Sequence, residues 1–199
     1  GGNAETARND FQAKLIGVGT EDFEGETGSA NGTALQFAGS AGNITATLSA
    51  PGAGSSFSSS GGAGRFATSG TTYLEGVQSG FTINFSQAVA ALGFYGTDIG
   101  DFNGQVTVAT TGGVNLDFTV NNTVNAPNGS LLFWGLIADD ASETFTSISF
   151  GNTNVGSDFF GFDDLTVGDI NQVAPVPLPA GMLLLGSALA GLGFARRRA

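Results

Sequence analysis

Short apolar runs rich in β-branched and aromatic residues recur along the chain, and clusters of Gly, Ser, Asn and Pro separate them. This spacing is typical of an all-β, jelly-roll-like β-sandwich. The 33 glycines disfavour long helices, and only residues 3–15 have helical character, so we predict one short N-terminal helix. The predicted strands lie within residues 14–19, 33–39, 43–49, 80–86, 89–96, 104–111, 114–120, 131–138, 145–151 and 159–168.

The chain divides into three predicted parts. Residues 1–168 form the β-sandwich ectodomain, residues 169–179 form a Pro-containing linker, and residues 180–199 form a hydrophobic helix with an Arg-rich end. The stretch Pro179–Ala195 would span about 25 Å as a helix, which is at the short end for crossing a bilayer. We therefore predict a transmembrane helix at the C terminus, with a buried C-terminal helix as the alternative.

The C-terminal segment has three ordered parts. They are the motif Val176-Pro177-Leu178-Pro179-Ala180, a Gly-rich apolar stretch, and the cluster Arg196-Arg197-Arg198. Basic residues that follow an apolar span remain on the cytoplasmic side of a membrane, so the cluster is predicted to act as a cytoplasmic stop.

This order resembles the PEP-CTERM class of sorting signals, in its VPLPA-type variant, over about 24 residues. Pro177-Leu178-Pro179 stands where that class has its Pro-Glu-Pro triplet, which implies a dedicated enzyme subtype. The resemblance implies that an exosortase, an integral-membrane cysteine transpeptidase of Gram-negative bacteria, recognises and removes the signal. It also implies an exported protein that is transiently anchored in the inner membrane and then reaches the cell surface or the extracellular (biofilm) matrix.

The charge distribution and the missing residue types exclude several functions. All 17 acidic residues precede residue 170, where only Arg8, Lys14 and Arg65 are basic. Such a body repels nucleic acid, and it suits metal cations or neutral ligands such as glycans. Because the chain has no His and no Cys, it cannot build a His-based or Cys-based catalytic triad or a His-based zinc site. We expect no enzymatic activity, and a carboxylate-based glycosidase is the remaining enzymatic alternative.

Two acidic segments, residues 20–25 (TEDFEG) and 159–167 (FFGFDDLTV), resemble the first and last strands of jelly-roll, carbohydrate-binding-like domains. In such domains these strands lie close together, and an acid from each often contributes to a structural calcium site. The residues that the resemblance implies as calcium ligands are Asp22, Glu24, Asp163 and Asp164. Alternation places Asp163 and Asp164 on opposite faces of their strand, so one carboxylate lies near the core or a bulge redirects it. Solvation, or hydrogen bonding to backbone N–H groups, is the alternative to calcium.

Two functional readings remain. The main one is a structural protein of the cell surface or matrix, capable of self-assembly. The alternative is a carbohydrate-binding module for exopolysaccharide, in which Tyr73, Tyr95 or Trp134 would stack on sugar rings. Trp134 lies in an almost continuous apolar run, residues 131–138, which favours core packing for this side chain.

We predict that the protein in its native cells lacks the Arg196-Arg197-Arg198 cluster and most of the apolar stretch before it. The Pro-rich motif presents an extended backbone, which a proteolytic enzyme needs. Intact-mass spectrometry of protein purified from its native cells measures the C terminus directly. A mass that places the end of the chain at Ala199 would contradict the prediction.

Overall fold

The computed structural model describes residues 2–50, 54–62, 64–77, 80–99, 105–120, 130–151 and 159–175. Helix α1 (Gly2–Gln12) opens these ranges, and the 3₁₀ helix η1 (Ile170–Gln172) closes them. The strands are β1 (Gly19–Glu21), β2 (Gly28–Ser29), β3 (Ala34–Phe37), β4 (Ile44–Ser49), β5 (Ser56–Ser58), β6 (Tyr73–Val77), β7 (Phe81–Val89), β8 (Ala91–Thr97), β9 (Gln105–Thr110), β10 (Asn115–Thr119), β11 (Leu131–Ile137), β12 (Phe145–Gly151) and β13 (Phe159–Gly168).

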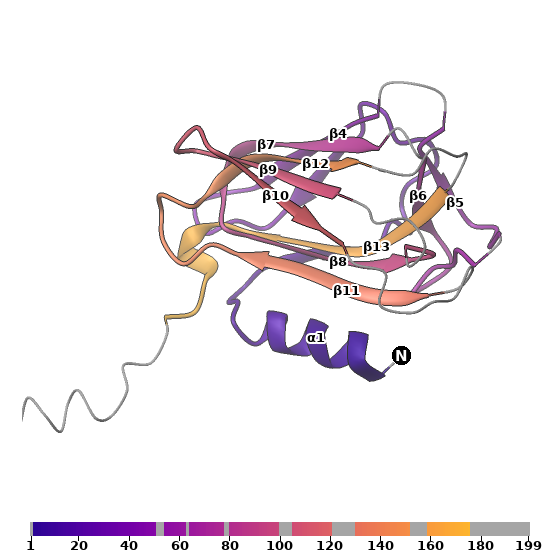
Figure 1. The fold of residues 1–199 in the computed structure, drawn as a ribbon, viewed down its shortest axis with the longest axis horizontal. Helices are drawn as coiled ribbons and strands as arrows, with labels where there is room; N and C mark the ends of the chain where they lie inside the picture. Colours follow the sequence, from indigo (N-terminus) through magenta and orange to yellow (C-terminus); the bar gives the residue numbers. More distant parts are fainter. Residues whose placement is uncertain are drawn as a thin grey trace, which may run out of the picture.

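The strands form two antiparallel sheets that pack face to face (Figure 1). One sheet has the order β11-β8-β13-β6-β5-β2, with β1 paired to β13, and the other has the order β10-β9-β12-β7-β4-β3. Strands that follow one another in the sequence repeatedly cross from one sheet to the other, which is the connectivity of a jelly roll. The predicted all-β, jelly-roll-like sandwich with a short N-terminal helix is confirmed.

Phenylalanine rings join the two sheets. The rings of Phe94 on β8 and Phe162 on β13 lie 4.8 Å apart between centroids. Both contact Phe150 of the opposite sheet, at 5.3 and 5.1 Å. Phe81 stacks on Phe150 at 4.6 Å. Aromatic pairs at these separations stabilise a core beyond the area that they bury, so this cluster holds the sandwich together.

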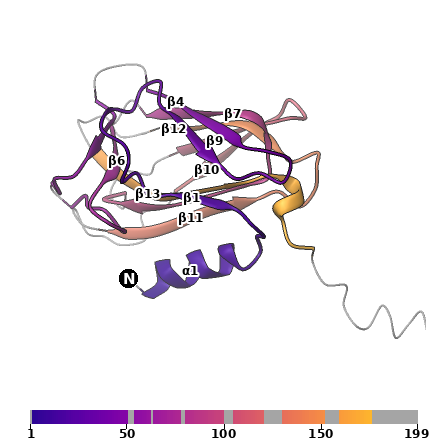
Figure 2. The ribbon, with the colours of Figure 1, turned by 180° about the vertical axis from the view of Figure 1, so that it is seen from behind.

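The first and last strands of the sandwich are neighbours, as the resemblance implied. β1 pairs with β13 in a register that places Glu21 opposite Leu165 (Figure 2). The register of β13 against β8 shifts between Asp163 and Thr166, and Asp164 has a φ of 51°. One extra residue at this point is a β-bulge. It lets Phe162 before the bulge and Leu165 after it both enter the core, while neither carboxylate does.

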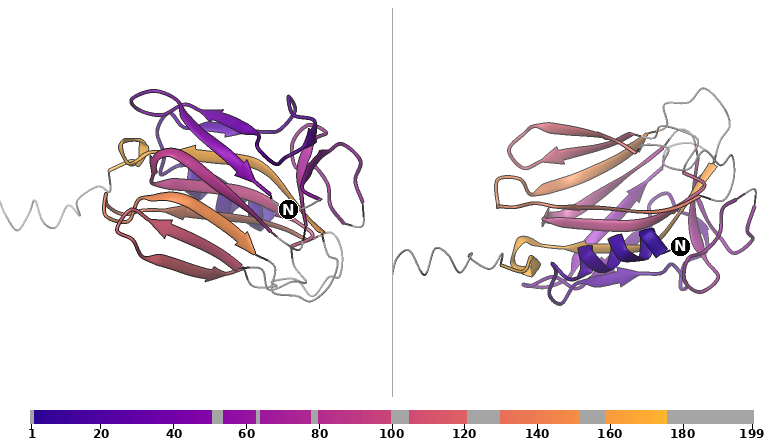
Figure 3. Two further views of the ribbon diagram at one scale, coloured as in Figure 1. Left: turned by 90° about the horizontal axis from the view of Figure 1, so that it is seen from above. Right: turned by 60° about the horizontal axis from the view of Figure 1, so that its bottom comes forward.

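Helix α1 covers the outer face of the seven-stranded sheet (Figure 3). Its Phe11 is buried and packs 5.4 Å from Phe133 of β11. The Phe11 ring lies over Gly93 and Gly135, where a side chain on either strand would collide with it. The helix is therefore seated by one aromatic ring over two glycines.

Residues at the start of the predicted linker are attached to the sandwich. The Gln172 amide donates hydrogen bonds to the backbone carbonyls of Gly17 (2.7 Å) and Ala38 (3.0 Å). The Ala174 backbone N–H donates to the Lys14 carbonyl at 2.8 Å. The folded body thus continues to Ala174, beyond the boundary at residue 168 that the sequence suggested.

The predicted C-terminal elements lie outside the described residues. These are the sorting motif Val176-Pro177-Leu178-Pro179-Ala180, the hydrophobic helix and the cluster Arg196-Arg197-Arg198. Within the described part of the chain, no helix combines the length and the apolar character needed to cross a membrane.

We expect Gly93→Val to destabilise the protein by about 1–3 kcal/mol, because overpacking forces neighbouring side chains out of position. A Cβ atom at Gly93 would lie 2.7 Å from both the Phe11 and the Phe133 rings. Gly25→Val is the matched control, since a Cβ there meets no atom within 4 Å. Urea unfolding of both variants measures the difference, and equal stability would show that Phe11 does not require the space above Gly93.

Candidate binding site

The loop between β5 and β6 is attached to the sandwich by side chains from distant parts of the sequence. Asp163 is 1% exposed, and its Oδ2 accepts hydrogen bonds from the backbone N–H groups of Thr68 (2.6 Å) and Ser69 (3.0 Å). The neighbouring Asp164 accepts the Ser69 hydroxyl at 2.8 Å and the Thr68 hydroxyl at 3.2 Å. Both carboxylates of the β13 bulge therefore bind the same two loop residues.

A third carboxylate holds the next part of the same loop. Glu24 accepts hydrogen bonds from the backbone N–H groups of Thr71 (2.7 Å) and Thr72 (2.5 Å). These bonds lower the pKa of the Glu24 carboxyl, because they favour its charged form. The acids at the two ends of the domain thus organise one loop.

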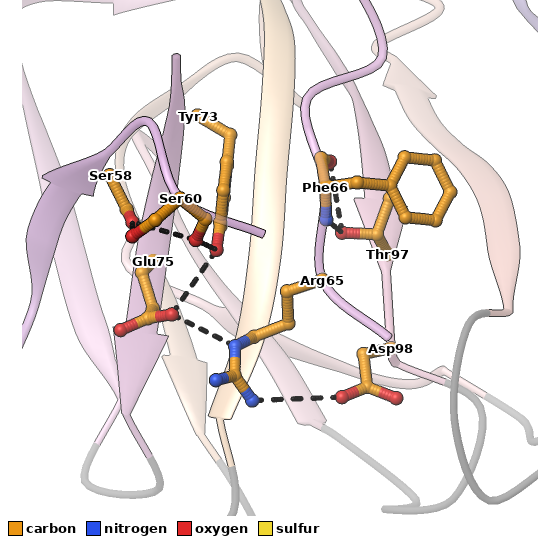
Figure 4. Close-up of polar contacts among 8 residues, drawn as sticks. All are labelled: Ser58, Ser60, Arg65, Phe66, Tyr73, Glu75, Thr97 and Asp98. Atoms are coloured by element: carbon orange, nitrogen blue, oxygen red, sulfur yellow. Dashed lines mark hydrogen bonds and ion pairs between the residues drawn. The ribbon is translucent and has the colours of Figure 1, made fainter. Parts of the chain in front are cut away.

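Arg65 fixes the middle of the β5–β6 loop (Figure 4). Its Nε donates to the Glu75 carboxylate at 2.8 Å, and its Nη1 lies 3.8 Å from Asp98. The guanidinium carbon also lies 5.1 Å from the centre of the Phe159 ring, a cation–π distance. Arg65 is thereby held by two acids and a ring.

The next residue, Phe66, projects its ring away from this ion pair, beside Thr97 (Figure 4). The Phe66 backbone N–H and carbonyl both lie 3.4 Å from the Thr97 hydroxyl. Its side chain remains 39% exposed. The loop therefore presents an accessible aromatic ring on a backbone held at several points.

Phe66 lines a pocket of about 390 Å³ at the side of helix α1. The pocket is lined by Glu5, Arg8, Phe66, Ala67, Thr68, Tyr95, Leu131 and Asp164. Its walls combine two aromatic residues with one cationic and two anionic side chains. We call this the α1 pocket.

Tyr95 enters the α1 pocket from β8 and stays in its neutral form. Burial raises the pKa of the Tyr95 phenol, the nearby Arg8 opposes that shift, and the carboxylates of Asp164 and Glu5 add to it. A neutral phenol retains a hydroxyl that can both donate and accept a hydrogen bond.

Of the three predicted sugar-stacking residues, only Tyr95 lines the α1 pocket. Trp134 packs against Phe94 and Phe118 at centroid distances of 5.7 and 6.1 Å, in agreement with the core-packing alternative. Tyr73 is 1% exposed, and its hydroxyl donates to nearby acceptors within the fold. Sequence reasoning missed Phe66. The available signal was a large aromatic residue inside a Gly-, Ser- and Thr-rich stretch.

The four predicted calcium ligands do not come together as one cation site. Asp163, Asp164 and Glu24 accept hydrogen bonds from the β5–β6 loop, and Asp22 accepts the Glu24 backbone N–H at 3.2 Å. Within the described ranges, no group of three or more acidic side chains is placed to hold a metal ion. The arrangement corresponds to the hydrogen-bonded alternative, and calcium binding stays a prediction from the sequence.

No protein-family model and no curated protein matches the chain. Among solved structures, it is similar to the K2 cleaved adhesin domain of Lys-gingipain, with 12% identity, 75% of this chain and 98% of that chain covered, and a TM-score of 0.43. It is also similar to the CBM22-1 xylan-binding domain of Paenibacillus barcinonensis Xyn10C, with 9% identity, 66% of this chain and 87% of that chain covered, and a TM-score of 0.39. A third similar structure is the family 11 carbohydrate-binding module of Clostridium thermocellum in complex with a mixed-linked tetrasaccharide. It has 13% identity, 77% of this chain and 96% of that chain are covered, and the TM-score is 0.37. Similarity this remote transfers no ligand and no site to this chain.

The buried Asp163 carboxyl makes the stability of the domain depend on pH. Burial raises the pKa of Asp163 to about 6, although three backbone N–H groups oppose the shift. The folded protein then binds this proton more tightly than the unfolded chain does. The stabilising contribution of the carboxyl is therefore complete below about pH 4, and it is lost as the pH rises through about 6.

We expect Asp163→Asn to remove that part of the pH dependence and to be less stable overall, because an amide cannot accept every bond that the carboxylate accepts. Glu24→Gln is the matched control. Because the pKa of Glu24 is lowered, this carboxyl makes stability rise with pH, whereas Asp163 makes it fall. Urea unfolding at several values between about pH 2 and about pH 7 measures both slopes, that of Asp163 between about pH 4 and 6 and that of Glu24 below about pH 4.5. An unchanged slope in Asp163→Asn would contradict the assignment.

Proposed function

We propose that the α1 pocket binds carbohydrate, with a sugar ring stacked on Phe66. The observation that carries this proposal is the exposed Phe66 ring on a loop held by Asp163, Asp164 and Glu24. A site ordered before binding loses little conformational entropy when the ligand arrives. These three carboxylates, of which Asp163 is buried, thereby serve the binding surface as well as the fold.

The polar groups of the pocket suit a ligand that carries many hydroxyls. Arg8 donates hydrogen bonds only, the carboxylates of Glu5 and Asp164 accept them, and the Tyr95 phenol does both. A pyranose offers an apolar ring face for Phe66 and hydroxyls at its edge for these groups. The volume of about 390 Å³ falls within the usual range for small-ligand sites.

The charge of the site favours neutral sugars over uronic acids. Two carboxylates, Glu5 and Asp164, face the pocket with a single cation, Arg8. The rest of the domain is acidic as well. An anionic sugar would be repelled by this field, whereas a neutral one would not. We therefore assign a neutral polysaccharide as the ligand class and binding without turnover as the activity.

A second element of function concerns location, and it is supported by the sequence motif Val176-Pro177-Leu178-Pro179-Ala180 and the apolar and Arg-rich segments after it. The chain is proposed to be exported, processed by an exosortase and retained at the cell surface or in the matrix. Binding to exopolysaccharide would contribute to that retention. The mass measurement of the C terminus tests this element separately from carbohydrate binding.

We expect Phe66→Ala to raise the dissociation constant for a bound neutral polysaccharide by about tenfold, the effect of losing one aromatic stacking contact. Affinity electrophoresis against a panel of neutral polysaccharides, followed by calorimetry on any ligand found, measures the change. Ile16→Ala is the matched control, because Ile16 is 59% exposed and lies outside the pocket. Wild-type protein that binds no member of the panel, or Phe66→Ala that binds as wild type does, would overturn the proposal.

A further inference from the structure

Strand β10 forms one edge of the six-stranded sheet, and no described strand pairs with its outer side (Figure 3, left). Two apolar side chains are exposed here: Val114, at 58%, and Leu116, at 39%. Natural edge strands usually carry Lys, Pro or a bulge, which discourages pairing with another chain. Residues 114–120 (VNLDFTV) contain no Lys or Pro and one charge, Asp117.

The backbone of β10 shows which residues can pair outward. The N–H of Thr110, the last residue of β9, donates to the Val114 carbonyl at 2.9 Å. Val114 and Thr110 are therefore a hydrogen-bonded pair. Hydrogen-bonded and non-hydrogen-bonded positions alternate along an antiparallel strand. Leu116 therefore directs its N–H and carbonyl groups toward β9, whereas Asn115 and Asp117 direct theirs toward the outer edge.

We propose that β10 pairs antiparallel with β10 of a second copy of this chain, about a two-fold axis at Leu116. This register places Asn115 opposite the second copy's Asp117, and both residues direct their backbone groups to the edge. The side chains then match on each face, with Leu116 opposite itself and Val114 opposite Phe118. The six-stranded sheet continues into the second molecule.

Charge favours the register with the axis at Leu116 over the register in which the two β10 strands overlap along their whole length. An axis at Asp117 would align the whole of β10 with itself, but it would place two Asp117 carboxylates opposite each other. Like charges directly opposite destabilise a strand pair. With the axis at Leu116, Asp117 faces a neutral amide, and its carboxylate already accepts the Thr107 hydroxyl at 2.7 Å.

A second copy fits this edge because the strand is complementary to itself in that register. The interface is one strand wide, and the two acidic bodies repel each other, so the association is weak and increases with salt. β10 belongs to the sheet opposite to the α1 pocket, so the pairing is independent of the proposed carbohydrate site.

Engineered cysteines test the pairing, because the natural chain has none. In the proposed dimer, Leu116 occupies a non-hydrogen-bonded pair, where opposite Cα atoms lie about 4.5 Å apart and a disulfide can form. Full-length Leu116→Cys is oxidised mildly at physiological salt, and covalent dimer is followed on non-reducing gels. Ile16→Cys is the matched control, since Ile16 is an exposed apolar residue away from the edge. The C-terminal segment is the same in both proteins, so association through it would affect both rates alike.

We expect Leu116→Cys to form covalent dimer at least about tenfold faster than Ile16→Cys, because pairing raises the effective concentration of its thiols. A mixture of Val114→Cys and Phe118→Cys, both of which retain Asp117, should form heterodimer in preference to either homodimer. Equal rates for Leu116→Cys and Ile16→Cys would overturn the pairing. A mixture of Leu116→Cys and Phe118→Cys that forms heterodimer faster than Leu116→Cys forms homodimer would overturn the register, because an axis at Asp117 places Leu116 opposite Phe118.

Discussion

The buried carboxylate of Asp163 is the constraint on which the candidate site depends. It lies at a bulge in β13, where one extra residue lets Phe162 and Leu165 both face the core. Without the bulge, one face of the strand would bring a charged side chain into an apolar interior, at a cost of several kcal/mol. The bulge directs the carboxylate to the β5–β6 loop, whose backbone N–H groups satisfy it.

The shortage of basic residues explains why backbone N–H groups, rather than a Lys or Arg side chain, donate hydrogen bonds to Asp163. Before residue 170 there are three basic residues for 17 acids, and one of them, Arg65, is already held by Glu75 and Asp98. Backbone N–H groups are then the available donors for buried acids. A loop that supplies them is fixed in place by the same bonds. The excess of acidic over basic residues therefore accounts for the ordered loop that carries Phe66.

The sequence predicted the layers of the fold better than the site. Alternation along strands such as β4 and β7 reports directly which side chains face the core, so the sandwich followed from pattern alone. The acids of β13 were also recognised, because adjacent carboxylates in an apolar strand conflict with its period. The loop position was not predictable, since Thr68 and Asp163 are 95 residues apart and such a bond leaves no local pattern. Attachment of Gln172 to Gly17 and Ala38 was missed for the same reason.

The two proposed surfaces lie on different sheets, and this placement has a consequence for binding strength. Pairing through β10 extends the six-stranded sheet, while the α1 pocket belongs to the seven-stranded sheet and its covering helix. A dimer would therefore keep both pockets open. Two pockets on one assembly bind a repeating polymer with an avidity that exceeds the affinity of either, provided that the polymer spans both. One such pocket and a weak edge contact, each modest alone, would then be sufficient to hold the protein on a polysaccharide matrix.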